Sequence, residues 1–276
     1  MQVHRVAAFT ENGTGGNPAG VVLADVLPDP ATMQRIAAEV GYSETAFAAL
    51  SGDVWLTRYY SPETEVPFCG HATVALGAVL AQEKGPGRYR LSLANGEIEV
   101  EASMKDGTGH AILRSLPTRN APAPEPLVEE ALRIFRYTRD ELDDSLPPRL
   151  MNAGAEHLLL ALKTRELLGA MRYDLEEGRT FMLHHGLVTV AFVWREAREL
   201  FHARNAFASG GVMEDPATGA AAAALAGMLR DRGILTRGEL TILQGADMGR
   251  PSRIVVRYDL PVGGPVHVSG AAARIG

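Results

Sequence analysis

The sequence has little cysteine and no long apolar run. Cys69 is the single cysteine among 276 residues, which excludes an intrachain disulfide and a zinc site built from several cysteines. No stretch approaches the ~18 uncharged apolar residues that a membrane span needs, and Met1–Arg5 leads into a strand-like pattern instead of an apolar leader. We therefore expect a soluble, cytoplasmic protein with no membrane partner.

Positive charge is not in excess either. The 27 basic and 33 acidic side chains give a formal net charge of −6 at pH 7, and no window forms a basic stripe. Nucleic acids and anionic membrane surfaces attract basic patches, so neither is an expected partner. A small molecule is the better prediction.

Histidine patterns typical of metal centres are also lacking. Only His184 and His185 are adjacent, and we expect them to point to opposite faces of a strand. No His-Glu-x-x-His pattern exists. The sequence therefore predicts a site without a metal ion.

What the sequence does contain is a mixture of strand-like and helical patterns, with 46% hydrophobic residues to form a core. Strand-like segments recur over Val3–Phe9, Tyr89–Leu93, Glu97–Glu101, Val188–Trp194 and Ile254–Tyr258. One amphipathic helix is well marked, because Asp29 can cap it, Pro30 suits its first position and Gly41 can end it. We predict an α+β chain rich in sheet.

A proline-rich segment divides the chain. Four prolines fall within the ten residues from Pro117 to Pro126, and we expect them to forbid regular structure and to form a stiff linker. This places an N-terminal lobe at residues 1–116 and a C-terminal lobe at residues 117–276. The last strand is a candidate to return to the first lobe.

An internal repeat relates the two lobes. An offset of 149 residues superposes Pro67–Leu80 on Pro216–Leu229 with six matches in fourteen positions. Each copy is a loop that ends in glycine, followed by a helix that is apolar on every side and must be buried within its lobe. We therefore predict two pseudo-symmetric lobes, each a rolled, mostly antiparallel sheet around a buried central helix.

The start of each central helix suggests the chemistry. A helix N-terminus offers free backbone N–H groups and the positive end of its dipole, which suit a carboxylate or an enolate-like oxyanion. The arrangement occurs twice, beside His71 in one copy and Glu214-Asp215 in the other. Two such ends that faced one cleft would hold one anion.

Three motifs carry a resemblance to a known family. Tyr42–Phe47, Glu65–Thr73 and Glu214–Gly219, with Gly16–Gly20, Gln244-Gly245 and Gly249–Ser252, resemble the PhzF-like family, the phenazine-biosynthesis isomerases and their relatives. The resemblance implies a diaminopimelate-epimerase-like fold with the active site between the lobes. It also implies a homodimer and catalysis without an organic cofactor or metal.

The resemblance also implies roles for individual residues. Glu44 would be the acid/base that removes a proton from one carbon and returns one to another, as general acid–base catalysis requires. His71 and Asp215 would orient polar groups of the substrate or relay protons. The substrate carboxylate would be bound by Ser43, Gly70, Thr218, Gly219 and Ala220.

The sequence departs from the family at Ala220, where the family commonly has serine. One hydroxyl contact to the substrate is thereby missing, whereas the backbone N–H is retained. We therefore expect an isomerase that moves a proton and a double bond in a small carboxylate-bearing substrate, resembling trans-2,3-dihydro-3-hydroxyanthranilate isomerase. The missing hydroxyl contact disfavours the phenazine intermediate itself as the substrate.

Two alternatives stay open. One is an amino-acid racemase or epimerase with bases other than cysteine, because the two-thiol mechanism needs a cysteine before the glycine of each repeat and the second copy has Thr218. Because the second thiol is missing, we expect Cys69 to be a small packing residue near the site. The other alternative is a binding protein of the same fold without catalysis.

Overall fold

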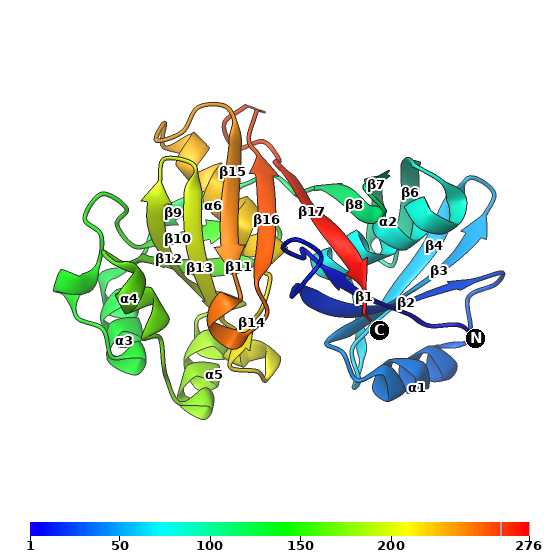
Figure 1. Ribbon diagram of the computed structural model, residues 1–276. Coiled ribbons are helices and arrows are strands. Elements are labelled where there is room, and N and C mark those ends of the chain that lie inside the picture. The colour runs from blue at the N-terminus through cyan, green and yellow to red at the C-terminus, as the bar shows by residue number, and fades with distance from the viewer. Residues whose placement is uncertain (260, 276) are drawn as a thin grey trace. The chain divides into compact units, whose positions relative to one another are not determined.

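The computed structural model describes residues 1–259 and 261–275, which divide into two compact units (Figure 1). The first unit contains Met1–Arg114 and the C-terminal segment from Ser269 onward, and the second contains Ser115–Val268. None of the helices in the described residues has the length and apolarity to cross a membrane.

The sheet of the first unit closes on itself. Its strands are β1 (His4–Ala8), β2 (Asn17–Ala24), β3 (Glu44–Ser51), β4 (Val54–Tyr60), β5 (Glu65–Val66), β6 (Gly87–Leu93), β7 (Gly96–Lys105), β8 (Thr108–Arg114) and β17 (His267–Arg274). Strand β2 is parallel to β3, and β4 is parallel to β6, whereas β1–β2, β3–β4, β6–β7 and β7–β8 are antiparallel. Because β17 pairs with both β1 and β8, these pairings complete a ring.

Helix α2 (Gly70–Lys84) occupies the interior of this ring (Figure 1). It packs against β1, β2, β3, β7 and β8, and every residue from His71 to Ala81 is buried. Gly77 permits the close approach, because a Cβ added there would lie 2.9 Å from the Cβ of Ala111. A helix buried on all sides must be apolar all round, as its sequence predicted.

Helix α1 (Pro30–Val40) lies on the outside of the first unit, against β3 and β4. The Asp29 side chain accepts a hydrogen bond from the backbone of Thr32, Pro30 occupies the first turn, and Gly41 ends the helix at φ 71°. Met33, Ile36 and Ala37 form a buried face against Val22, Phe47 and Tyr60. The predicted boundaries of this helix are confirmed.

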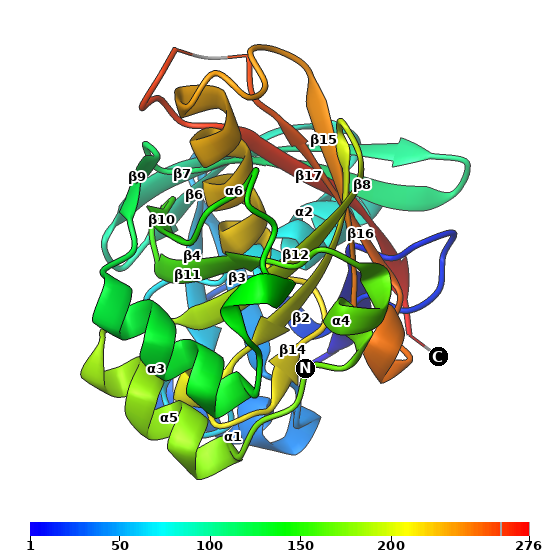
Figure 2. The ribbon, with the colours of Figure 1, turned by 90° about the vertical axis from the view of Figure 1, so that its left-hand side faces the viewer.

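The second unit repeats the same plan with more helices outside (Figure 2). Its strands are β9 (Arg119–Pro122), β10 (Arg149–Asn152), β11 (Glu156–Ala161), β12 (Thr189–Ala197), β13 (Leu200–Ala206), β14 (Glu214–Asp215), β15 (Glu239–Gln244) and β16 (Ser252–Arg257). Helix α6 (Gly219–Asp231) is buried against β9, β10, β11 and β16. The outer helices are α3 (Glu125–Phe135), α4 (Arg165–Gly169) and α5 (Leu175–His184).

The order of strand pairings is the same in both units. In the first unit β1–β2 is antiparallel, β2–β3 parallel, β3–β4 and β4–β5 antiparallel, β4–β6 parallel and β6–β7 antiparallel. In the second unit β10–β11, β11–β12, β12–β13, β13–β14, β13–β15 and β15–β16 repeat this series. The predicted α+β fold with two similar lobes around central helices is confirmed.

Two local predictions are wrong. The proline-rich segment is not irregular, because Arg119–Pro122 forms β9, antiparallel to β10, and α3 begins at Glu125. Proline is tolerated there because Pro122 ends a strand, Pro124 caps α3 and Pro126 lies in its first turn, where the missing N–H would have no helical partner. His184 and His185 do not lie on a strand but at the C-terminal end of α5.

Candidate active site

Glu44 is the first residue of β3 and follows the left-handed Gly41 that ends α1. Its side chain is 18% exposed, and its Oε2 is buried without a hydrogen bond from the described residues. Nε2 of His71 lies 3.3 Å from Oε2, within the distance of an ion pair. A surface glutamate would be hydrated, so this carboxylate has an environment that an ordinary surface residue lacks.

His71 is the second residue of α2 and is nine-tenths buried. Its Nε2 lies 3.3 Å from Glu44 Oε2 and 3.3 Å from Ser43 Oγ. Its Nδ1 lies 3.4 Å from Sγ of Cys69, the residue that caps the helix. The structure therefore brings Ser43, Glu44 and His71 together and adds Cys69 to them.

The first turn of α2 leaves donors unused by the helix. The first bond of the helix runs from the N–H of Thr73 to the carbonyl of Cys69, so the N–H groups of Gly70, His71 and Ala72 have no helical acceptor. A Cβ added at Gly70 would meet no atom within 4 Å. Close packing therefore does not require glycine at this position.

Other glutamates in the motifs are paired with arginines. Glu214 accepts hydrogen bonds from Arg204, with the shortest at 2.5 Å, and both side chains are at least 88% buried. Glu65 lies 3.5 Å from Arg58 and accepts a hydrogen bond from the hydroxyl of Tyr60. An arginine partner engages the lone pairs of a carboxylate through charge-assisted hydrogen bonds. Glu44 has no Lys or Arg partner among the described residues, and its Oε2 accepts no hydrogen bond from them.

The equivalent loop of the second unit leads into α6. The hydroxyl of Thr218, the N-cap residue, donates a 2.6 Å hydrogen bond to Oδ2 of Asp215. The backbone N–H of Thr218 donates to the side-chain oxygen of Gln244. The first helical bond runs from Ala222 to the carbonyl of Thr218, so the N–H groups of Gly219 and Ala220 have no helical acceptor.

A buried chain of hydrogen bonds ends on this loop, and the sequence reasoning missed it. Thr189 donates to Asn205 at 3.0 Å, so Thr189 accepts from Nδ1 of His157, which lies 2.8 Å away. Asn205 donates in turn to Gln244, and Gln244 donates to the carbonyl of Asp215 at 2.7 Å. Gln244 also donates to the hydroxyl of Thr218 at 3.1 Å. From His157 to the carbonyl of Asp215 each donor is on the side of His157, whereas the backbone N–H of Thr218 donates in the opposite direction, to Gln244.

Burial of this hydrogen-bond chain fixes the protonation state of His157. His157, Thr189, Asn205 and Gln244 are all at least 98% buried, and burial lowers the pKa of His157 to about 4. The imidazole is therefore neutral at pH 7, with its proton on Nδ1. No sequence pattern marked these four residues as partners, because each lies on a different strand that also carries other polar residues.

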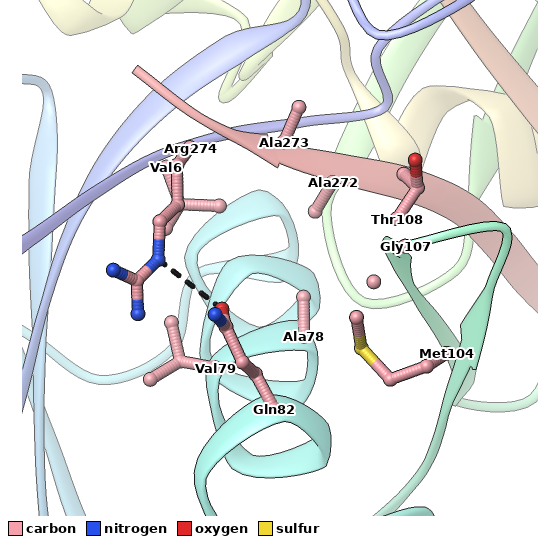
Figure 3. Close-up of a pocket in the computed structure, with 11 residues that line it drawn as sticks. Val6, Ala78, Val79, Gln82, Met104, Gly107, Thr108, Ala272, Ala273 and Arg274 are labelled. Atoms are coloured by element: carbon pink, nitrogen blue, oxygen red, sulfur yellow. Dashed lines mark hydrogen bonds between the residues drawn. The ribbon is translucent and has the colours of Figure 1, made fainter. Parts of the chain in front are cut away.

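A cavity of about 200 Å³ in the first unit is a different feature (Figure 3). Ala78, Val79 and Gln82 of α2, Met104 and part of β17 line it. Its one charged lining residue is Arg274, which donates to Gln82 and pairs with Glu83 at 3.0 Å. No carboxyl, thiol or imidazole group lines this cavity, so it has no acid–base chemistry and is not the candidate active site.

Comparisons with known proteins agree with the fold and the motifs. A family model described as phenazine biosynthesis-like protein, PhzC-PhzF, matches residues 6–275. An uncharacterized isomerase of Deinococcus radiodurans is 34% identical over 92% of this chain and 86% of its own. The trans-2,3-dihydro-3-hydroxyanthranilate isomerase of Pseudomonas fluorescens is 31% identical over 92% of this chain and 89% of its own.

Among solved structures, the PhzF-family phenazine biosynthesis protein of Bacillus anthracis superposes with a TM-score of 0.88 at 23% identity, covering 100% of this chain and 98% of its own. At that identity the structural match supports the fold, and the family model together with the curated relatives supports membership and enzyme class. The chain therefore belongs to the phenazine biosynthesis-like family and is an isomerase of that family.

Proposed function

We propose that this isomerase moves a proton and a double bond in a small, carboxylate-bearing, unsaturated substrate, without an organic cofactor or a catalytic metal ion. A relative over most of the chain is named for trans-2,3-dihydro-3-hydroxyanthranilate, an unsaturated cyclic amino acid, which supports this substrate class. Ala220, which lacks a hydroxyl, favours a substrate that differs from this compound at one polar group.

The observation that carries the proposal is the environment of Glu44. Its Oε2 is buried, accepts no hydrogen bond from the described residues and lies 3.3 Å from Nε2 of His71. A general base needs an acceptor atom that is held in place and is not already bonded. Glu44 meets both conditions, whereas Glu65 and Glu214 are bound to arginines.

The proposed reaction begins when Glu44 takes a proton from a carbon next to an electron-withdrawing group. The electrons of the C–H bond form a new double bond, and the charge that develops is stabilised by the N–H groups at the start of α2. Glu44, now protonated, returns the proton to another carbon of the same system. Proton and electrons balance within the substrate, so no oxidant or reductant is needed.

The remaining residues have proposed binding roles. Ser43 and the N–H of Gly70 would hold the substrate carboxylate beside His71. Asp215, whose orientation is fixed by Thr218, would orient a polar group of the substrate, and the N–H groups of Gly219 and Ala220 would bind an anionic oxygen. The homodimer and the cytoplasmic location stay predictions.

Proton NMR in D₂O tests this function directly. We would incubate wild type and Glu44→Gln with trans-2,3-dihydro-3-hydroxyanthranilate and with a panel of small unsaturated amino and hydroxy acids. Deuterium entry together with a shifted double bond, in wild type alone, is the expected result. Glu39→Gln is the control, because Glu39 is an exposed residue of α1 that pairs with Arg35.

The other outcomes are equally informative. Exchange in both wild type and Glu44→Gln would move the base to another residue. Exchange at a stereocentre without migration of the double bond would favour the racemase or epimerase. Binding of a panel compound without exchange in wild type would favour a binding protein and contradict the proposal.

A further inference from the structure

Glu44, Cys69 and His71 bring three different metal-binding groups to one place. One carboxylate oxygen, the Cys69 sulfur and one imidazole nitrogen all lie within 4.8 Å of one another. Cys69 and His71 are both at least nine-tenths buried. Carboxylate, thiolate and imidazole are the three ligand types of zinc, and open zinc sites use three protein ligands and a water molecule.

The separation of the carboxylate oxygen and the imidazole nitrogen suits a tetrahedral ion. Zinc bonds of about 2.0 Å to nitrogen and oxygen and 2.3 Å to sulfur place tetrahedral ligands about 3.3 to 3.6 Å apart. Glu44 Oε2 and His71 Nε2 are 3.3 Å apart, whereas Cys69 Sγ is 3.9 Å from Nε2 and 3.4 Å from Nδ1. The sulfur therefore lies nearer Nδ1, and the Cys69 side chain must turn about its one torsion to reach an ion held by Nε2 and Oε2.

The electrostatics of the cluster also favour a cation. Oε2 of Glu44 is buried and accepts no hydrogen bond from the described residues. No lysine or arginine of the described residues pairs with this carboxylate, and the nearest cationic candidate is His71 itself. A bound divalent ion would supply the positive charge that a buried carboxylate requires.

We propose that Glu44, Cys69 and His71 bind a thiophilic divalent cation, for which Zn²⁺ is the best fit, and that the ion inhibits the isomerase. The thiol releases its proton to solvent and the sulfur bonds to the metal, while Nε2 of His71 and Oε2 of Glu44 donate lone pairs. The lone pair of Glu44 is then unable to accept a substrate proton, and this inhibitory part rests on the proposed function. Hard ions such as Mg²⁺ avoid thiolate and are not expected to bind.

Cobalt binding tests the site without any substrate. Untagged, full-length protein is stripped with a chelator, reduced, and titrated with Co²⁺, which takes zinc-type sites and reports its ligands by absorption. We expect one equivalent to produce the near-ultraviolet thiolate-to-metal band and intense visible bands of a four-coordinate ion, both abolished by Zn²⁺. Because Cys69 is the single cysteine of the chain, any such thiolate band must come from it.

Variants assign the ligands. Cys69→Ala should abolish the thiolate band, and Glu44→Gln should weaken Co²⁺ binding at least about tenfold, as loss of a ligand requires. His202→Gln is the matched control, because His202 forms a partly exposed pair with Glu196 at 2.5 Å elsewhere in the chain. Absence of the band in wild type, or its persistence in Cys69→Ala, would overturn the site.

Turnover rates test whether the bound ion inhibits the isomerase. The rate with micromolar Zn²⁺ is divided by the rate with chelator for each variant, so that differences in basal activity cancel. We expect at least tenfold inhibition in wild type and in His202→Gln, and a ratio near one in any active Cys69→Ala. Cobalt binding with an unaffected rate would overturn the inhibition alone. Loss of turnover in Glu44→Gln without Co²⁺ binding in wild type would overturn the cation site and leave the proposed function intact.

Discussion

The hydroxyl of Thr218 donates a 2.6 Å hydrogen bond to Oδ2 of Asp215, three residues earlier in the chain. Gln244 in turn donates to the Thr218 oxygen and to the backbone carbonyl of Asp215. A carboxylate held by a hydroxyl that is itself fixed has little rotational freedom. Asp215 is therefore presented in one orientation before any substrate arrives.

Thr218→Val should release this carboxylate while it keeps the shape of the side chain. We expect kcat to fall roughly tenfold, in line with the loss of one hydrogen bond to a charged group, and Thr218→Ser to retain most of the rate. Steady-state kinetics and thermal unfolding of both variants provide the measurement. Equal rates in valine and serine variants would show that the hydroxyl does not position Asp215 for turnover.

His71→Ala and Asp215→Ala should both damage catalysis more than folding. His71 contacts the proposed base, and the orientation of Asp215 is fixed by Thr218. We expect kcat/KM to drop by roughly 100-fold or more in each, within the range of general acid–base contributions. If both variants show normal kinetics, the two residues have structural roles only.

Gly70→Ala and Gly77→Ala should separate binding from stability. A Cβ at Gly70 meets nothing within 4 Å, so the fold should tolerate alanine, and we expect the added methyl group to crowd a substrate bound at the first turn of α2. A Cβ at Gly77 lies 2.9 Å from Ala111, and such overpacking typically costs about 1 to 3 kcal/mol. We expect Gly70→Ala to raise KM at an unchanged Tm and Gly77→Ala to lower Tm. The reverse pattern would remove Gly70 from the binding site.

Much of this fold was predictable because local signals agreed with tertiary packing. Asp29, Pro30 and Gly41 each mark a boundary of α1 by a local backbone rule, and the structure follows all three. The repeat predicted two central helices because an all-apolar helix has only one stable place, the interior. The prediction for the proline-rich segment was wrong because β9 is stabilised by pairing with β10, about 30 residues later in the chain. No local sequence pattern encodes such a distant pairing.

The site was predictable in part. The sequence motifs pointed to Ser43, Glu44 and His71 as site residues, and the structure brings these three together. Cys69 was assigned to packing because Thr218 in the second repeat excludes a two-thiol mechanism, and its contact with His71 at the first turn of α2 was not predicted. The chain from His157 to Gln244 joins residues up to 87 positions apart on four strands, so it follows from the strand order rather than from sequence spacing.

His157 should make the second unit less stable in weak acid. Its pKa is lowered to about 4 by burial, against an ordinary value of 6.5, so the unfolded chain binds a proton between pH 6.5 and 4 that the folded chain does not. The free energy of unfolding is highest, as far as this group is concerned, above pH 6.5. It decreases as the pH falls toward 4, by about 2 kcal/mol at pH 5.

Trp194 lies in the second unit and Trp55 in the first, so Trp55→Phe allows urea unfolding of the second unit to be followed by fluorescence. In that background, His157→Gln should lower stability at pH 7 and reduce the difference between pH 7 and pH 5. An unchanged pH difference in His157→Gln would mean that other groups cause the acid sensitivity.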